Sequence, residues 1–166
     1  YGVSKYAAEQ GLLALNDDYF TVIALRKGTI SGYSPRMRFD LLINTMYKNV
    51  MKEGVIRINN PELRRPILYI QDAVSVYCRC VNEPIHGGVY NVISYNTTLG
   101  CIARDVKEWC KKPVDMKVSF VGDMRSYNAH GDLYSTQYKM NVFPYVTTEM
   151  ILKNIDEHKN EYEDLN

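Results

Sequence analysis

The 166-residue sequence lacks an excess of charge of either sign, because 20 lysines and arginines stand against 19 aspartates and glutamates, for a net charge of +1. Such a balance provides no long-range attraction to nucleic acid or to an anionic membrane, and we expect neither as a partner. No apolar run approaches the ~20 residues that a membrane-spanning helix requires. Recognition of an anion must therefore come from a few locally placed cations.

Cysteine is scarce, and its four residues are Cys78, Cys80, Cys101 and Cys110. A C-x-C pair followed by C-x8-C lacks the spacing of zinc ligands, and the three histidines are scattered, so we predict no metal site. We expect buried, reduced thiols instead. Together with the absence of a secretory segment, this favours a cytosolic location.

Glycine is placed sparsely as well. Its ten residues nowhere form a Gly-x-x-Gly-x-x-Gly turn, the kind of strand-to-helix turn that lets a backbone approach the pyrophosphate of a dinucleotide. The sequence therefore carries no motif of its own for holding that pyrophosphate.

Helix-like and strand-like segments alternate along the chain, which predicts the α/β class. Apolar residues at helical spacing predict helices over residues 1–15, 39–53, 72–83, 98–109 and 147–155. Apolar, β-branched runs predict strands over residues 20–25, 55–58, 67–70, 89–93 and 116–121. We expect the first strand to be central and buried on both faces. In the third helix, Gln71 or Asp72 is expected to be the N-cap and Tyr77 to belong to the buried stripe.

Tyr1 and Lys5 stand four residues apart on the first predicted helix, so the phenol and the ammonium share one face, one turn apart. A free tyrosine has a pKa of ~10 and serves as a general acid or base near neutrality only when nearby positive charge stabilises its phenolate. Lys5 supplies such a charge. The alternative is an ordinary exposed helix pair, since a chain with 14 tyrosines yields this spacing by chance.

The longer string Tyr1-Gly-Val-Ser-Lys5-Tyr-Ala-Ala-Glu-Gln10 resembles the Tyr-x-x-x-Lys helix of the extended short-chain dehydrogenase/reductase family, the NAD-dependent sugar-nucleotide epimerases and dehydratases. Later segments match the same family in order. Residues 24–32 resemble its strand and loop beside the nicotinamide, although Lys27 replaces the common proline. Residues 34–44 resemble a segment that closes over the nucleotide sugar, and residues 63–72, 123–127 and 138–151 resemble its arginine-bearing and C-terminal segments.

The resemblance implies a role for each matched residue. Tyr1 is the catalytic acid/base and Lys5 its partner, and both contact NAD or NADP. The cofactor side also includes Lys27, Gly28 and Thr29, and the implied contacts to a nucleotide-diphosphate sugar are Thr29, Arg38, Asn44, Arg65 and Arg125. The last two arginines grip the diphosphate, for which a rigid guanidinium fork is suited. Taken singly, the same residues also fit a glycine-punctuated loop, a solvent-facing amide and solvated arginines.

In that family the Tyr-x-x-x-Lys motif lies mid-chain, whereas here it begins at residue 1. We therefore expect a C-terminal portion of a Rossmann-like enzyme that lacks the Gly-rich half, present as a gene fragment or as an expressed part. Residues 1–33 would be a remnant of the Rossmann-like domain and residues 34–166 the substrate-binding α/β region. NAD or NADP would bind in the full-length parent, and this chain alone would be inactive. A homodimer through the first helix is compatible with apolar residues between 3 and 15.

Two other functions stay open. One is a non-catalytic relative that senses a nucleotide or a partner protein, and the other is an independent small α/β binding module. Retention of Tyr1, Lys5 and both diphosphate arginines argues against the sensor, which needs no acid/base pair. The sequence specifies neither the sugar nucleotide nor the reaction.

Overall fold

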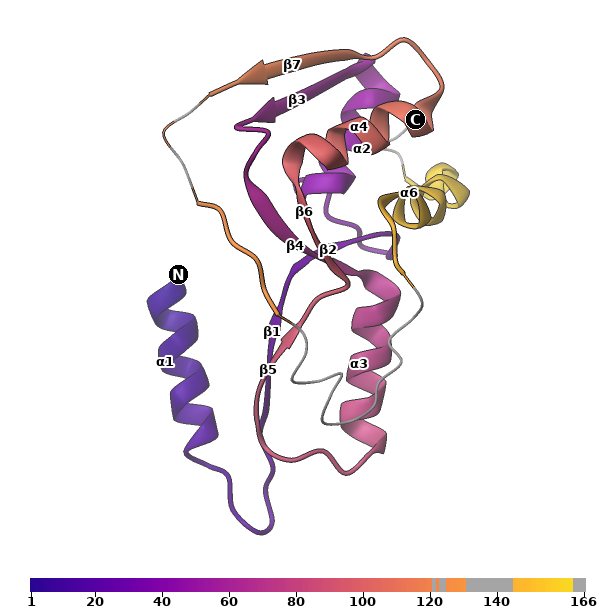
Figure 1. The fold of residues 1–166 in the computed structure, drawn as a ribbon. Helices are drawn as coiled ribbons and strands as arrows, with labels where there is room; N and C mark the ends of the chain where they lie inside the picture. The colour runs from indigo at the N-terminus through magenta and orange to yellow at the C-terminus, as the bar shows by residue number, and fades with distance from the viewer. Residues whose placement is uncertain (121, 123–124, 131–144, 163–166) are drawn as a thin grey trace.

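The fold is an alternation of helices and mainly parallel strands, seen in a computed structural model that describes residues 1–120, 122, 125–130 and 145–162 (Figure 1). Its elements are α1 (Gly2–Leu13), β1 (Ile23–Lys27), β2 (Thr29–Ser31), α2 (Leu42–Glu53), β3 (Val55–Asn59), β4 (Arg64–Tyr69), α3 (Ile70–Asn82), β5 (Gly88–Val92), β6 (Tyr95–Thr98), α4 (Leu99–Cys110), β7 (Asp115–Ser119), α6 (Thr148–Glu157) and the 3-10 turn η1 (Lys159–Glu161). The predicted α/β class is confirmed. Among these elements, no helix is long and apolar enough to cross a membrane.

The strands form three small sheets. β1 pairs in parallel with β5, β3 pairs in parallel with β7, and β4 lies between the parallel β2 and the antiparallel β6. The chain changes sheet at Gly28, whose N–H donates to the carbonyl of Val92 at 2.9 Å. A Cβ at Gly28 would lie 2.9 Å from the carbonyl oxygen of Pro66, so only glycine lets the chain between β1 and β2 come this close to β4.

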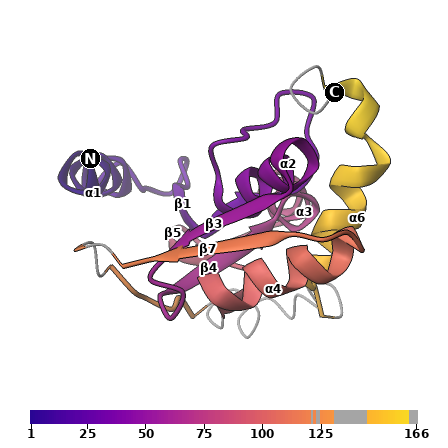
Figure 2. The same ribbon diagram turned by 90° about the horizontal axis from the view of Figure 1, so that it is seen from above.

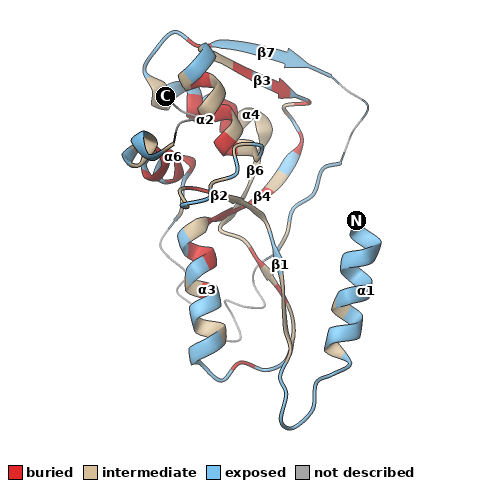
Figure 3. Cartoon of the chain, turned by 180° about the vertical axis from the view of Figure 1, so that it is seen from behind, coloured by how far each residue is buried: buried red, intermediate tan, exposed pale blue. Residues whose placement is uncertain are grey.

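Two hydrophobic clusters hold the elements together. The larger joins α2, α4 and α6 to β3, and its fully buried side chains include Ile43, Tyr47, Ile56, Ile102, Ile151 and Leu152. The smaller joins α3 to β4 and β5. Figure 3 shows the buried residues gathered on these elements, whereas α1 carries none. The stable body of the chain is therefore built from residues that follow β1.

Helix α1 stands apart from this body (Figures 1 and 2). None of its residues is buried. Its side-chain link to the first strand is a paired contact in which Arg26 donates to Glu9 at 2.8 and 2.6 Å. Tyr1 is the N-cap of the helix and lies outside its first turn, but its carbonyl accepts from the N–H of Lys5 at 3.0 Å, as the four-residue spacing predicts.

The first predicted strand is wrong in place and in burial. The strand begins at Ile23, three residues later than expected, and its last two residues are exposed. Two polar side chains hold the preceding residues in a loop: Asp17 accepts from the N–H groups of Tyr19 and Phe20, and Asn16 accepts from that of Val22. Among the described strands β1 pairs with β5 alone, so it is not central. The β1–β5 pair joins residues on both sides of the domain boundary predicted at residue 33. That boundary stays a prediction.

Helix α3 differs from the prediction at its start and along one face. It begins at Ile70, so Gln71 and Asp72 lie inside its first turn and neither is the N-cap. Tyr77 is 47% exposed and not part of the buried stripe. The cysteines are free thiols as expected, but Cys78 is exposed and the other three are half-buried. Thr98 is the N-cap of α4, because its hydroxyl accepts from the N–H of Cys101.

Candidate active site

A pocket of about 480 Å³ opens where β1 meets β2, bounded by the loop that precedes α2 and by the start of α3. Its lining comprises Tyr1, Lys27, Gly28, Thr29, Ile30, Gly32, Ser34, Arg36, Arg38, Leu41, Asn44, Ile70 and Tyr127. Six of these were predicted from the sequence as catalytic, cofactor or substrate residues: Tyr1, Lys27, Gly28, Thr29, Arg38 and Asn44. The fold thus brings most of the sequence-predicted site residues together at one place.

The Tyr1 side chain lies at the rim of this pocket and is 95% exposed. The ammonium of Lys5 lies 5.5 Å from the centroid of the Tyr1 ring, although Lys5 itself does not line the pocket. The contact is a cation–π approach of the ammonium to the ring. The two side chains therefore lie on the same side of α1, as their spacing predicts.

Positive charge predominates in the pocket, because Lys27, Arg36 and Arg38 line it and none of the described lining residues is Asp or Glu. Lys27 donates to the hydroxyl of Tyr77 at 2.8 Å, which fixes its ammonium against α3. Arg38 makes a two-point ion pair with Asp40, at 3.0 and 2.6 Å. Because Asp40 offsets the charge of Arg38, the positive charge that remains is that of Lys27 and Arg36, and it suits an anionic ligand.

Asn44 has a role that the sequence did not indicate. It is 3% exposed, so the solvent-facing alternative is wrong. Its Oδ1 accepts from the N–H of Gly32 at 3.3 Å, and its Nδ2 donates to the carbonyl of Arg38 at 3.0 Å. The amide therefore joins the two ends of the pocket loop, and any contact to a substrate would be additional to these bonds.

The two predicted diphosphate arginines lie together beside the pocket rather than in its lining. The Arg65 guanidinium donates to the backbone carbonyls of Arg64, at 2.8 Å, and of Arg125. It also lies 5.6 Å from the centroid of the Tyr127 ring, and Tyr127 lines the pocket. Asp123, the first residue of the predicted 123–127 match, and residues 138–144, half of the predicted 138–151 match, lie outside the described residues.

Residues 125–130 are held against the sheets mainly by side chains that the sequence did not single out. Asn96 donates to the carbonyl of Ala129 at 2.8 Å and accepts from its N–H at 3.0 Å. Arg64 donates through Nε to Asn128 at 2.9 Å, and Asn91 donates to the carbonyl of His130 at 3.1 Å. No spacing in the sequence signals these contacts, since each joins residues at least 33 positions apart.

A second pocket of about 380 Å³ adjoins the first and shares Lys27, Gly28 and Tyr127 with it. Its other lining residues are Arg26, Pro66, Asn91, Asn128, Ala129 and His130. The segment 125–130 therefore borders both pockets, and Tyr127 stands between them.

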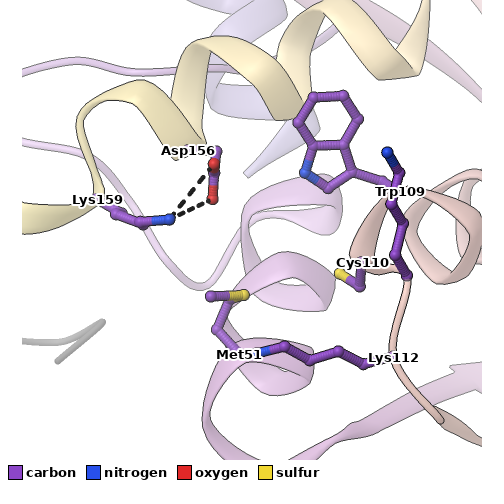
Figure 4. Close-up of a pocket in the computed structure, with 7 residues that line it drawn as sticks. Met51, Trp109, Cys110, Lys112, Asp156 and Lys159 are labelled. Atoms are coloured by element: carbon purple, nitrogen blue, oxygen red, sulfur yellow. Dashed lines mark hydrogen bonds and ion pairs between the residues drawn. The ribbon is translucent and has the colours of Figure 1, made fainter.

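A third pocket of about 280 Å³ lies near the ends of α2, α4 and α6 and contains none of the predicted site residues (Figure 4). In it Asp156 accepts from Lys159, at 3.2 and 3.4 Å, and from the hydroxyl of Tyr47 at 2.5 Å. Burial, together with that carboxylate, raises the pKa of Tyr47. The residues around this pocket therefore belong to the packing of α2, α4 and α6 against one another.

Comparison with known sequences identifies the kind of protein to which this site belongs. The sequence model of the NAD dependent epimerase/dehydratase family matches residues 1–92, more than half of the chain. The chain belongs to this family. UDP-2-acetamido-2,6-beta-L-arabino-hexul-4-ose reductase of Pseudomonas aeruginosa is 25% identical over 125 residues, which are 74% of this chain and 34% of that protein. The chain therefore spans about a third of the length of this curated relative.

Solved structures of the same kind resemble the fold of this epimerase/dehydratase chain. The dTDP-glucose 4,6-dehydratase of Bacillus anthracis, in complex with NAD, has a TM-score of 0.80 and 18% identity, over 100% of this chain and 55% of that one. The UDP-glucuronic acid 4-epimerase of Bacillus cereus, in complex with UDP-glucuronic acid and NAD, has a TM-score of 0.79 and 20% identity, over 98% and 53%. At these identities the likeness shows the fold alone.

NAD, the cofactor in the name of the epimerase/dehydratase family, needs polar contacts for its nicotinamide ribose and a backbone site for its pyrophosphate. The pocket that holds Tyr1, Gly28 and Thr29, with Lys5 close by, has the donors and the open backbone that a nicotinamide and its ribose require. Three of the described helix starts do not suit the pyrophosphate end. α3 and α6 have an acidic residue in the first turn, and an N-terminal amide of α4 is already capped by Thr98.

Proposed function

We propose that this chain is the C-terminal, substrate-binding part of an NAD-dependent nucleotide-sugar epimerase or dehydratase. The observation that carries the proposal is the grouping of Tyr1, Thr29 and Asn44, three residues from separate motifs, around one pocket with surplus positive charge. Membership of the epimerase/dehydratase family argues against an independent binding module.

Tyr1 and Lys5 are the acid/base pair of this function. The phenol oxygen of Tyr1 takes a proton from a sugar hydroxyl or returns one, and the nearby Lys5 ammonium stabilises the charge that develops on that oxygen. When bound, NAD would supply reversible hydride transfer to and from a sugar carbon. Because the hydride is returned, the net reaction is an isomerisation or an elimination, and the sugar decides which.

Arg65 and Arg125 bind the diphosphate of the nucleotide sugar in this proposal. The Arg65 guanidinium is held by the Tyr127 ring and by the Arg125 carbonyl, so its position is set before a ligand arrives. On the other side, Asn44 fixes the loop that carries Arg36 and Arg38. Lys27, Gly28 and Thr29 border the nicotinamide, and Thr29 also faces the sugar.

By itself this chain is inactive in our proposal and binds NAD poorly, because its sequence has no Gly-rich strand-to-helix turn to hold the pyrophosphate. We further propose a cytosolic location, in keeping with the four free thiols.

A homodimer forms through α1, whose exposed apolar side chains Val3, Tyr6 and Leu12 provide a contact surface. Neither nucleic acid nor a membrane is a partner.

The experiment that tests the acid/base assignment is Tyr1→Phe in the full-length protein, assayed with UDP-, GDP- and dTDP-sugars. Turnover is expected to fall by about 10²–10⁴-fold, the usual contribution of a general acid/base. Tyr19→Phe, at a 99% exposed tyrosine outside the pocket, is the matched control and keeps full activity. Unchanged turnover in Tyr1→Phe contradicts the assignment, whereas absence of turnover in the wild-type full-length protein favours a non-catalytic relative.

The coding sequence upstream of Tyr1 separates the remaining alternatives. An in-frame Gly-rich βαβ segment supports the proposal, whereas a start codon at that point favours an independent module. Turnover of any nucleotide sugar by the isolated 166-residue chain contradicts the proposed inactivity.

A further inference from the structure

One wall of the charged pocket is a loop with no regular secondary structure between β2 and α2. Gly32, Ser34, Arg36 and Arg38 of this loop line the pocket. A loop of this kind leaves its side chains free to move unless other parts of the chain restrain its backbone. Asn44 restrains both ends of the loop from one side, at Gly32 and at Arg38.

The second restraint comes from α6, at the other end of the chain. Asn154 is 8% exposed, and its Oδ1 accepts from the N–H of Tyr33 at 2.8 Å, across 121 positions of sequence. The same oxygen would lie 3.2 Å from a Cβ placed on Gly32, whose φ of +119° already favours glycine. The loop backbone therefore lies directly against the Asn154 amide.

Aromatic side chains extend this contact toward η1. The ring of Tyr33 stacks on that of His158, with centroids 3.8 Å apart and planes inclined by 16°. The hydroxyl of Tyr33 donates to Glu161 at 2.6 Å. Tyr162 makes two further contacts. Its hydroxyl donates to the carbonyl of Ser34, and its ring forms a T-shaped pair with the ring of Phe39, with centroids 5.2 Å apart.

We propose that α6, η1 and Tyr162 form a clamp that fixes the pocket loop, residues 32–39, with Asn154 as its principal positioning residue. The clamp holds Ser34, Arg36 and Arg38 in place before a ligand arrives, so the ordering of the loop is not left to the binding step. The part of this inference that concerns the ligand rests on the proposed nucleotide-sugar function. The part that concerns the loop rests on the contacts alone.

The test compares Asn154→Leu with Asn154→Asp in the full 166-residue chain. Leucine has nearly the same size but cannot accept from the Tyr33 N–H, whereas aspartate keeps an acceptor oxygen there. Hydrogen–deuterium exchange read by mass spectrometry is expected to be at least tenfold faster over residues 32–39 in Asn154→Leu, with β3 unchanged. Asn154→Asp is expected to restore slow exchange.

The second measurement is calorimetric titration with UDP-glucose, GDP-glucose and dTDP-glucose. The probe that binds the wild-type chain best is expected to bind Asn154→Leu at least fivefold more weakly and Asn154→Asp normally. If Asn154→Leu does not fold, Tyr162→Phe gives the same test. It keeps the ring against Phe39 and removes only the bond to the Ser34 carbonyl.

The outcomes separate the clamp from the proposed function. Unchanged exchange over residues 32–39 overturns the clamp, and so does wild-type affinity in a variant whose loop exchanges faster. If none of the three probes binds the wild-type chain, the nucleotide-sugar proposal fails. The exchange comparison then tests the clamp by itself. Faster exchange over residues 32–39 in Asn154→Leu than in the wild type supports the clamp, and equal exchange rates overturn it.

Discussion

The Arg65 guanidinium lies 5.6 Å from the centroid of the Tyr127 ring and donates to the backbone carbonyl of Arg125. This relationship joins β4 to a segment some sixty positions later in the sequence. It places both arginines of the proposed diphosphate site beside a tyrosine that lines two adjoining pockets. The geometry of the proposed diphosphate site therefore depends on an aromatic residue as well as on the cations.

Replacing Tyr127 tests this dependence. Tyr127→Ala removes the ring, and an exposed cation–π contact contributes roughly 0.5–1 kcal/mol. We therefore expect a loss of about two- to fivefold in affinity for the best-bound nucleotide sugar, measured by calorimetric titration. Tyr127→Phe keeps the ring and is expected to bind like the wild type. A phenylalanine variant as weak as the alanine variant would mean that the hydroxyl, not the ring, matters.

Asn96 is expected to control the order of residues 128–130. Asn96→Ala removes two hydrogen bonds to the backbone of Ala129, each with a net value of about 1 kcal/mol. Hydrogen exchange at the Ala129 amide should become at least fivefold faster, and unfolding in urea should show a loss of about 1–2 kcal/mol. Asn82→Ala, which removes one local bond at the exposed C-terminal end of α3, is the control and should change neither measurement.

Gly28→Ala is expected to destabilise the junction of β1 and β2. The new Cβ would lie 2.9 Å from the carbonyl oxygen of Pro66 in β4, so this junction must move away from β4. We expect the change to cost about 1–3 kcal/mol in the free energy of unfolding. Gly11→Ala is the matched control. A Cβ at Gly11 meets nothing within 4 Å in exposed α1, where alanine is the better helix former by up to ~1 kcal/mol. Equal effects of the two changes on urea unfolding would contradict the proposed strand contact.

Asp72 is expected to make the stability of the chain depend on pH. It is 1% exposed, and burial raises its pKa above the ordinary 3.8, against the effect of the Ser94 hydroxyl that donates to it. The folded state therefore holds this proton more firmly than the unfolded state. The resulting stability is fully present below the ordinary pKa and is lost as pH rises through the raised one.

Asp72→Asn stays neutral and still accepts from Ser94, so this pH-dependent loss should disappear. The free energy of unfolding of the asparagine variant, relative to the wild type, should rise as pH increases above the ordinary aspartate pKa of 3.8. Ser94→Ala removes the bond that lowers the pKa and should steepen the wild-type dependence. Parallel stability curves for Asp72→Asn and the wild type would show that the Asp72 carboxyl does not titrate in this way.

Most elements of the fold follow from local patterns in the sequence. The spacing of Met46 and Val50 predicts α2, and both side chains are buried in it. Gly54 ends that helix with a φ of 66°, as a left-handed C-cap requires. The first strand could not be placed in this way, because Asp17 and Asn16 form side-chain bonds to backbone amides that the apolar pattern does not reveal.

By itself the sequence determined the residue types of the candidate site and the local geometry of single helices. The four-residue spacing of Tyr1 and Lys5 is enough to place them one turn apart, since a helix has a fixed period. The tertiary structure alone decided which distant residues meet: Tyr1 with Thr29 at the pocket, Asn44 with the backbone of its loop, and Asn154 with Tyr33. Such contacts depend on how helices pack on the sheets, and that packing is a property of the whole core, not of any local pattern.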